Sequence, residues 1–213
     1  MKRGSLFSEL VRKTLHLSGL FVVVGYTLLL NYFSPRTALL VLTGVLLVLL
    51  EIEYIRLEHK PRGRVLDFFA SVIRSHEKNQ LTGAVFFVMS CIIAFSAFDY
   101  WIAILATFMT VFGDLFAALA GKAFRGKKFY KRKTVIGTLA GLLANLAVGF
   151  LILPDYPILF IPIALTATFV EVFTTKMDDN LTVPLFSGFV GQIMLYYSGL
   201  ALPPIDFTFL GFF

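Results

Sequence analysis

Residues 110–137, TVFGDLFAALAGKAFRGKKFYKRKTVIG, join an apolar helix to the most basic loop of the chain. The helix carries one acid, Asp114. A carboxylate costs roughly 2.5–3.5 kcal/mol at the centre of a bilayer, so its presence in such a helix indicates a functional site, with a structural hydrogen bond between helices as the alternative. Gly113, Ala117 and Gly121 recur every four residues, which leaves one helix face nearly bare. Another helix can therefore pack closely against this face.

The loop that follows holds seven cations within twelve residues. They are Lys122, Arg125, Lys127, Lys128, Lys131, Arg132 and Lys133. Such a run beside a membrane suits anionic lipid headgroups or a polyphosphate substrate. It is also a common topology signal, and the loop alone does not separate these readings.

Composition places the chain among helical membrane proteins. Of its 213 residues, 58% are hydrophobic and only 15% are charged. The apolar residues come in long runs, which predicts an all-α, polytopic membrane bundle forming one domain over residues 1–213. The net charge of +6 is not a nucleic-acid signal, because the cations cluster at the ends of the apolar runs.

Seven apolar runs predict seven transmembrane helices. Their approximate ranges are 16–33, 37–55, 81–95, 100–120, 134–153, 158–175 and 183–202. Residues 1–15 and 57–80 are basic and amphipathic, so we expect helices that lie on the membrane surface there. In the fifth run, Gly137, Gly141, Asn145 and Gly149 form a small and polar stripe. This stripe suits tight packing, either within the chain or across a homodimer.

The distribution of basic residues predicts the orientation. With a cytoplasmic N-terminus and seven spans, 18 of the 19 Lys and Arg residues fall in inner segments, and only Arg36 lies outside. We therefore expect a multi-pass integral membrane protein, in the plasma membrane if the source is prokaryotic. The end of the Asp114 helix and the pair Asp178–Asp179 then lie on the cytoplasmic side, which predicts an active site facing the cytoplasm.

Further acids follow the sixth run. At helical spacing, Ala164, Thr168, Glu171, Thr175 and Asp178 share one face, so an acid inside the helix and one beyond it point the same way. With Asp179 and Asp114 these make up to four carboxylates near the basic loop. Mg²⁺ prefers such oxygen ligands together with substrate phosphates, whereas a solvated turn is the simpler interpretation of residues 178–180.

Four ordered elements resemble the CTP-dependent lipid-alcohol kinases, which include dolichol, polyprenol and phytol kinases and the CTP-using diacylglycerol kinases. The elements cover most of the chain. They are Arg12-Lys13 with His16; Glu77 with Leu81-Thr82-Gly83-Ala84; Asp114, Ala117 and Gly121 with Lys133-Thr134 and Gly137, similar to the proposed CTP motif DxxAxxxG…KTxEG; and Glu171 with Asp178-Asp179-Asn180 and Pro184. Two positions depart from the pattern, since Arg125 replaces a second glycine and Ile136 replaces the Glu of KTxEG.

The resemblance implies a reaction in which CTP and a membrane alcohol give a lipid monophosphate and CDP, with Mg²⁺ as cofactor. Asp114 is expected to orient or deprotonate the lipid hydroxyl or to bind a metal, and Glu171 to support either role. Asp178 and Asp179 are the expected Mg²⁺ ligands, and Lys133 is the leading phosphate ligand. Expected CTP contacts are Arg12, Lys13, His16, Gly121, Lys122, Lys127, Lys128, Lys133, Thr134, Gly137 and Asn180. Expected contacts to the lipid are Thr82, Gly83 and Ala117, with its tail between helices in the gap left by small residues.

Several alternatives stay open. A polyprenol or dolichol-type alcohol is favoured, but phytol, geranylgeraniol or diacylglycerol would fit the same pattern. A phosphatidate cytidylyltransferase also joins CTP to a lipid, but the late motif usual in that family is absent. Other classes are a small ion-coupled transporter using Asp114 and Glu171 as a relay, and a non-enzymatic assembly subunit.

Overall fold

The computed structural model describes residues 17, 19–59, 80–124, 127–130, 133–174 and 177–205. The residues Arg12, Lys13 and His16, the amphipathic segment at 1–15 and most of that at 57–80 lie outside this part of the chain. So do Glu77, Arg125, Lys131 and Arg132.

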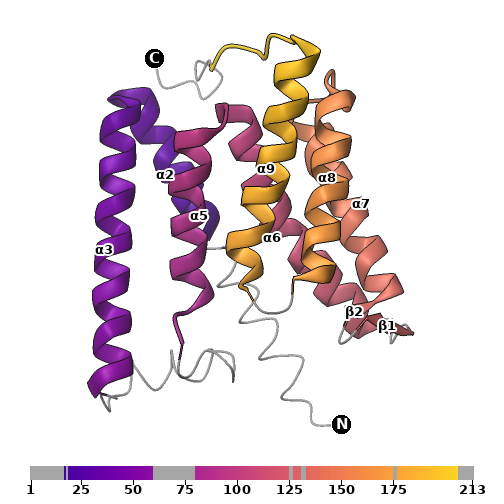
Figure 1. The fold of residues 1–213 in the computed structure, drawn as a ribbon, viewed down its shortest axis with the longest axis horizontal. Helices are drawn as coiled ribbons and strands as arrows, with labels where there is room; N and C mark the ends of the chain where they lie inside the picture. The colour runs from indigo at the N-terminus through magenta and orange to yellow at the C-terminus, as the bar shows by residue number, and fades with distance from the viewer. Residues whose placement is uncertain are drawn as a thin grey trace.

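Seven helices and one small hairpin form the described structure (Figure 1). The helices are α2 Gly19–Tyr32, α3 Pro35–His59, α5 Gly83–Ala97, α6 Tyr100–Ala123, α7 Val135–Ile152, α8 Pro157–Phe173 and α9 Asp179–Ser198. The strands are β1 Lys128–Tyr130 and β2 Lys133–Thr134, which pair antiparallel between α6 and α7. The prediction of an all-helical protein is confirmed for these residues.

Local chemistry explains where the helices begin and end. Asp99 caps α6 by accepting a hydrogen bond from the Trp101 amide at 3.0 Å. Pro157 opens α8, where a missing amide hydrogen costs nothing. Gly199 ends α9 at φ 62°, a left-handed conformation that glycine adopts without strain.

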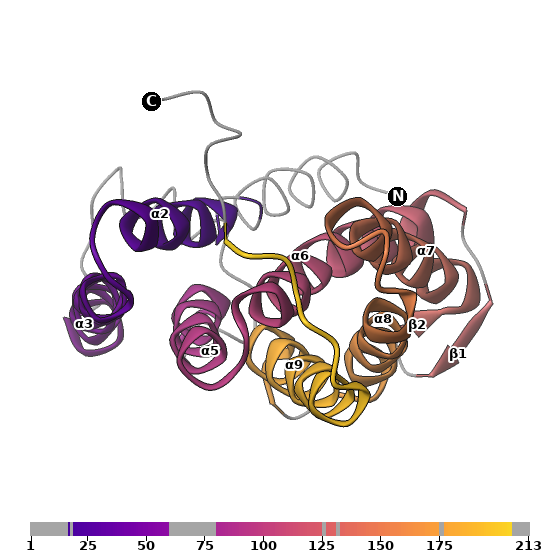
Figure 2. The same ribbon diagram turned by 90° about the horizontal axis from the view of Figure 1, so that it is seen from above.

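Two hydrophobic cores meet at α6. One core joins α2, α3, α5 and one side of α6, and it includes Val23, Cys91 and Ala103. The other fills the space among α6, α7, α8 and α9, around residues such as Leu105 and Ile163. Figure 2 shows the result from above: α2 and α3 form an outer pair, α5 lies beside α3 on one side and beside α6 and α9 on the other, and α6 packs against α7, α8 and α9. Helix α6 is accordingly the most buried of the long helices.

Small residues allow α6 and α7 to cross closely. A Cβ atom on Gly137 would lie 2.6 Å from the backbone oxygen of Ala117, and one on Gly141 would lie 3.2 Å from the oxygen of Gly113. The predicted close approach is thus confirmed, and at these positions it occurs within the chain. The space expected for a lipid tail between these glycines is instead filled by the facing helix, because the two backbones come into direct contact.

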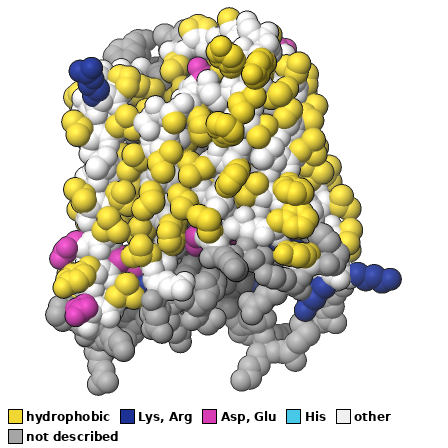
Figure 3. Space-filling model, viewed as in Figure 1, with side chains coloured by type: hydrophobic (Ala, Val, Ile, Leu, Met, Phe, Trp, Pro, Cys, Tyr) yellow, Lys and Arg dark blue, Asp and Glu magenta, His cyan; other side chains and the backbone are white. Residues whose placement is uncertain are grey.

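The outer surface is apolar, as expected in a bilayer. Each helix exposes at least one large hydrophobic side chain. Examples are Phe21, Leu40, Ile93, Phe116, Leu151, Phe169 and Phe189. Figure 3 shows that hydrophobic side chains cover most of the face in view, with the basic side chains that are drawn near its upper and lower ends. A water-soluble protein rarely exposes such a continuous apolar surface.

Within the described part of the chain, three helices are long and apolar enough to cross a membrane. They cover Pro35–Glu58, Tyr100–Ala123 and Val135–Ile152. Helices α2, α5 and α8 are apolar but shorter, with 14, 15 and 17 residues, whereas about 20 residues span a typical bilayer. Membrane-spanning character is therefore supported, and the count of seven spans and the orientation stay predictions.

The sixth and seventh helices differ from their predicted boundaries. Helix α8 ends at Phe173, and Asp178 is the N-cap of α9. The prediction that Thr168, Glu171 and Asp178 share one helix face is therefore wrong for Asp178, because the chain leaves the helix before reaching it. The start of α9 places Asp179 and Asn180 in its first turn, four residues earlier than expected.

Candidate functional site

A cavity of about 320 Å³ lies where α6 ends, the hairpin turns and α7 begins. In Figure 1 this region is at the lower end of the bundle, beside the labels β1 and β2. Its lining residues are Asp114, Ala117, Ala118, Gly121, Lys122, Lys128, Lys133, Thr134, Gly137, Thr138 and Glu171. Nine of these eleven were predicted as site residues; Ala118 and Thr138 were not.

Two carboxylates from separate helices face this cavity. Asp114 comes from α6 and is half-buried, whereas Glu171 comes from α8 and is only 6% exposed. Gly141 of α7 lies between their helices, since a Cβ on it would lie 3.2 Å from the Gly113 oxygen of α6 and 3.7 Å from Glu171 Oε2. Any larger residue at Gly141 would narrow the space beside this carboxylate.

Lys133 joins the carboxylates to the basic loop. Its Nζ donates a hydrogen bond of 2.8 Å to Glu171 Oε1. Burial alone lowers the pKa of Lys133, but the charges of Glu171, Asp179 and Asp114 outweigh that effect and raise this pKa above its usual value. Lys133 therefore carries its charge at neutral pH, and three acids from three helices act on it.

The hairpin and the helix cap hold Lys133 in place. Thr134 caps α7 by accepting a hydrogen bond from the Gly137 amide at 3.1 Å. The Val135 amide donates to the Lys127 carbonyl oxygen, and Tyr130 contacts Phe173 of α8 with ring centroids 5.3 Å apart. The predicted CTP contact Thr134 thus has a structural role as well as a place in the cavity wall.

The other lysines differ in position. Lys122 lies in the last turn of α6 and Lys128 in β1, and both line the cavity with exposed side chains. A cation in the last turn of a helix is favoured by the helix dipole. Lys127 is exposed and is not among the lining residues.

Asp178, Asp179 and Asn180 lie at the start of α9 and do not line the cavity. The Oδ1 atom of Asp178 accepts a hydrogen bond of 2.9 Å from the Asn180 amide, so this carboxylate is used in capping. Asn180 is 4% exposed. Asp179 lies near enough to Lys133 and Glu171 for its charge to act on both.

The expected metal ligands do not form a preformed cage. Among the described residues, no group of three or more His, Cys, Asp or Glu side chains is placed to hold a metal ion. Asp114 and Asp179 both act electrostatically on Glu171, so they approach the same region from different helices. These carboxylates fit a metal ion whose other ligands are substrate phosphates and water.

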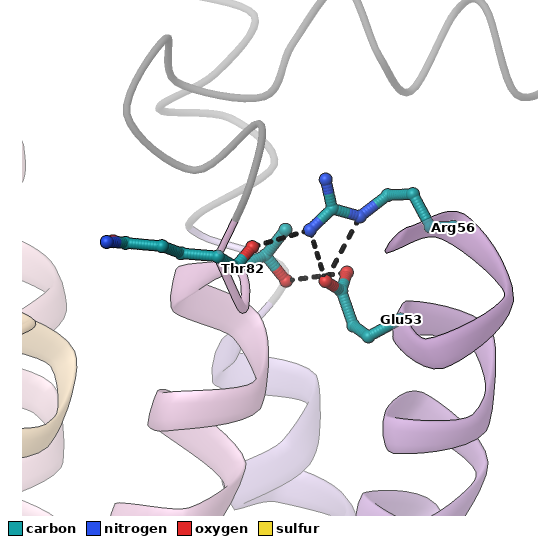
Figure 4. Close-up of polar contacts among 4 residues, drawn as sticks. Glu53, Arg56 and Thr82 are labelled. Carbon is teal, nitrogen blue, oxygen red and sulfur yellow. Dashed lines mark hydrogen bonds and ion pairs between the residues drawn. The ribbon is translucent and has the colours of Figure 1, made fainter. Parts of the chain in front are cut away.

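Thr82, a predicted lipid contact, belongs to a different polar cluster at the start of α5 (Figure 4), and Gly83, another predicted lipid contact, is the first residue of that helix. The Thr82 hydroxyl donates to Glu53 Oε1 at 3.1 Å, and Arg56 Nε donates to Glu53 Oε2 at 3.1 Å. Arg56 also donates to the Gln80 carbonyl oxygen at 2.6 Å. This cluster ties α3 to α5, and only Ala117 of the three predicted lipid contacts lines the cavity.

A second buried polar group lies deeper between α7 and α8. Asn145 Nδ2 donates to Thr168 Oγ1 at 3.0 Å, and Thr168 donates to the Ala164 carbonyl oxygen at 2.9 Å. A Cβ on Gly113 would lie 2.6 Å from Asn145 Oδ1, so this amide packs directly against α6. The predicted polar stripe of α7 therefore helps to hold three helices together.

The site combines a buried acid with one fixed lysine and two exposed lysines at the end of a helical bundle. Lysines can neutralise phosphate oxygens, and the carboxylates can accept a proton or contact a metal ion. Comparisons with models of protein families, with curated proteins and with solved structures found no match. The function is therefore argued from the geometry of this cavity and from the motifs that the chain carries.

Proposed function

We propose that the protein transfers the γ-phosphoryl group of CTP to the hydroxyl of a membrane lipid alcohol. The observation that carries this proposal is the meeting of Asp114 and Glu171 with Lys122, Lys128 and Lys133 around one cavity. Two of the four elements that resemble CTP-dependent lipid-alcohol kinases contribute residues to this cavity, namely the element from Asp114 to Gly137 and the element that begins with Glu171. A polyprenol or dolichol-type isoprenoid is the favoured acceptor.

The triphosphate binds to the lysines and to the start of α7. Phosphoryl transfer needs neutralisation of the phosphate charge and an oriented acceptor, and little covalent chemistry by the protein. Lys133 is held at the cavity, with Lys122 and Lys128 on its open side. The first amides of α7 add the positive end of a helix dipole, which favours phosphate. Lys133 can bind a phosphate oxygen while it keeps its hydrogen bond to Glu171, because an ammonium group has three donor hydrogens.

Mg²⁺ is the metal that the resemblance implies. The carboxylates present fit a Mg²⁺ ion that is also bound by the triphosphate. Mg²⁺ commonly uses one or two carboxylates and completes its coordination with phosphates and water. Asp179 and Asp114 are the residues that would hold it, since the Oδ1 atom of Asp178 accepts the hydrogen bond that caps α9. When bound, Mg²⁺ supplies neutralisation of charge on the transferred phosphoryl group.

The acids provide the proton acceptor. The acceptor oxygen forms a bond to the γ-phosphorus, and the bond from the γ-phosphorus to the bridging oxygen breaks, so that CDP leaves. The hydroxyl proton passes to a carboxylate in the cavity, Glu171 or Asp114. Glu171 is well suited because it is almost fully buried and its Oε1 atom is already fixed by Lys133.

Membrane topology completes the proposal. In the predicted topology of seven membrane helices with a cytoplasmic N-terminus, the cavity lies at the inner leaflet, where it can meet CTP from the cytoplasm and a lipid hydroxyl from the membrane. The apolar surface seen in Figure 3 provides a path for the lipid chain along the outside of the bundle. The tail does not need the α6–α7 interface, which the facing glycines close.

The test is a matrix of nucleotides and lipid alcohols assayed with the purified full-length protein in nanodiscs. We expect CTP and an isoprenoid alcohol to give a lipid monophosphate and CDP, and a matched Glu171→Gln protein to give at least 100-fold less product. Release of pyrophosphate instead of CDP would indicate a cytidylyltransferase. Ion flux in liposomes without nucleotide, with no phosphorylated lipid, would indicate a transporter.

A further inference from the structure

The hydroxyl of Thr138 is buried without a hydrogen-bond partner. Among the described residues, only two buried side-chain nitrogen or oxygen atoms lack a partner: Thr138 Oγ1 and Asn145 Oδ1. Asn145 Oδ1 packs against Gly113 of α6, whereas Thr138 lines the cavity. An unsatisfied buried hydroxyl is costly, so Thr138 indicates an interaction that forms with a ligand.

Other buried hydroxyls in these helices show what Thr138 does differently. Each donates to a carbonyl oxygen of the preceding turn, which is the usual solution inside a helix: Ser90 bonds three residues earlier, and the others bond four residues earlier. These residues are Ser90, Thr107, Thr110, Thr168, Thr182 and Ser187. Thr138 makes no such bond to Thr134, although it stands in the first turns of a regular helix.

The neighbours of Thr138 are already committed to other partners. The Thr134 hydroxyl accepts the Gly137 amide hydrogen, and Lys133 occupies Glu171 Oε1. The other carboxylate oxygen, Glu171 Oε2, lies against α7 at Gly141, one turn after Thr138 on the same helix face. Thr138 and Glu171 both line the cavity, and Glu171 Oε2 lies one helical turn along α7 from Thr138.

We infer that Thr138 binds the hydroxyl of the acceptor alcohol and holds it beside Glu171. This inference rests on the proposed function. A neutral alcohol suits the position, because its oxygen can accept from Thr138 while its proton is donated to Glu171 Oε2. A phosphate group suits it less, because the buried carboxylate would repel it. When the alcohol oxygen bonds to the γ-phosphorus of CTP, its proton moves to Glu171 and CDP leaves.

The test compares Thr138→Val with Thr138→Ser in the full-length protein. Binding of geranylgeraniol is measured in nanodiscs without nucleotide, alongside its methyl ether, which has no hydroxyl proton. We expect Thr138→Val to weaken geranylgeraniol binding roughly tenfold, the effect of losing one hydrogen bond at a buried site. Thr138→Ser should bind like the wild type, CTP affinity should stay unchanged in both variants, and the methyl ether should bind weakly to all three proteins.

Thermal stability separates this role from a structural one. Because Thr138 has no partner in the protein, Thr138→Val should not lower the melting temperature. The matched control is Thr168→Val, which removes a hydroxyl with two partners and should lower it. Equal geranylgeraniol affinity in wild type and Thr138→Val would overturn the inference about Thr138 and leave the kinase proposal standing. A wild-type protein that neither binds nor phosphorylates any lipid alcohol would overturn both.

Discussion

At the scale of single residues, the Lys133–Glu171 ion pair sets the electrostatics of the cavity. The Glu171 side chain is 7% exposed and that of Lys133 is 31% exposed, so the acid is the more deeply buried partner. A buried carboxylate without a counter-ion is strongly destabilising. Asp114 and Asp179 add negative charge on the same side, so the cavity needs the lysine even before a nucleotide arrives.

Replacement of Lys133 with Met should therefore destabilise the protein by about 2–3 kcal/mol, below the range for a fully buried pair. The pKa of Lys133 is raised above its usual value near 10.5. The stabilisation from the ion pair is thus complete below the pKa that Lys133 has in the unfolded chain. It disappears only as the pH rises through the higher pKa that Lys133 has in the folded protein. We expect the difference in unfolding free energy between wild type and Lys133→Met to be constant from pH 7 to about 10. Unfolding in mixed detergent micelles measures it, and a difference that vanishes by pH 9 would contradict this account of the ion pair.

Asp179 should control the metal requirement more than Asp178 does. Asp179→Asn removes a charge that acts on Lys133 and Glu171, so the Mg²⁺ concentration for half-maximal activity should rise at least several-fold. Asp178→Asn is the matched control, because Asn also caps helices well and keeps the start of α9 intact. Titration of Mg²⁺ against kinase activity compares the two variants. Identical Mg²⁺ curves for Asp179→Asn and wild type would remove Asp179 from the metal site.

The sequence predicts the charged part of the site better than its neutral part. Asp114 and Glu171 stand out because acids are rare in apolar runs, and Lys133 because it belongs to a dense basic segment. Thr138 gives no such signal, since threonine is common in membrane helices and its missing hydrogen bond depends on the packing around it. Thr82 was placed with the site by motif alone, and its bond to Glu53 in Figure 4 shows a role between α3 and α5.

At the scale of helices, apolar runs predict that a helix is present, and capping residues predict where it begins and ends. All seven predicted runs contain a helix, because a long apolar segment in a bilayer has to satisfy its backbone internally. The junction after Phe173 differs from the prediction because helical spacing does not continue to Asp178, where the next helix begins. Asp178 carried the missed signal, since an acid followed by the start of an apolar run is a typical N-cap.

The glycines of α6 and α7 make a prediction at this scale. Gly137→Ala would bring a methyl group to 2.6 Å from the Ala117 carbonyl oxygen, so the helices must separate, at a cost of about 1–3 kcal/mol. The control is Gly44→Ala in α3, where no atom lies within 4 Å of the new methyl group. There alanine should stabilise the helix, by up to about 1 kcal/mol. Unfolding of both variants in detergent micelles measures the difference, and equal stability would mean that α6 and α7 are not in close contact.

At the scale of the whole molecule, the two hydrophobic cores and the apolar surface describe a membrane bundle with its cavity at one end. The orientation can be tested with substituted cysteines, because the native Cys91 is fully buried. We expect Lys128→Cys to react with a membrane-impermeant maleimide only when the cytoplasmic face is accessible. Arg36→Cys should react only from the opposite face. Labelling of both from one side would contradict the seven-span topology with a cytoplasmic N-terminus.

The central claim is that acids from separate membrane helices and lysines of the following hairpin form one phosphoryl-transfer site. The most direct measurement uses CTP labelled at the γ-phosphate, an isoprenoid alcohol and the purified protein, with Asp114→Asn as the matched variant. We predict that the wild type moves the label to the lipid and releases CDP, while Asp114→Asn stays folded and loses the activity. Failure of the wild type to transfer label to any lipid alcohol, or near-wild-type turnover in Asp114→Asn, would contradict the account.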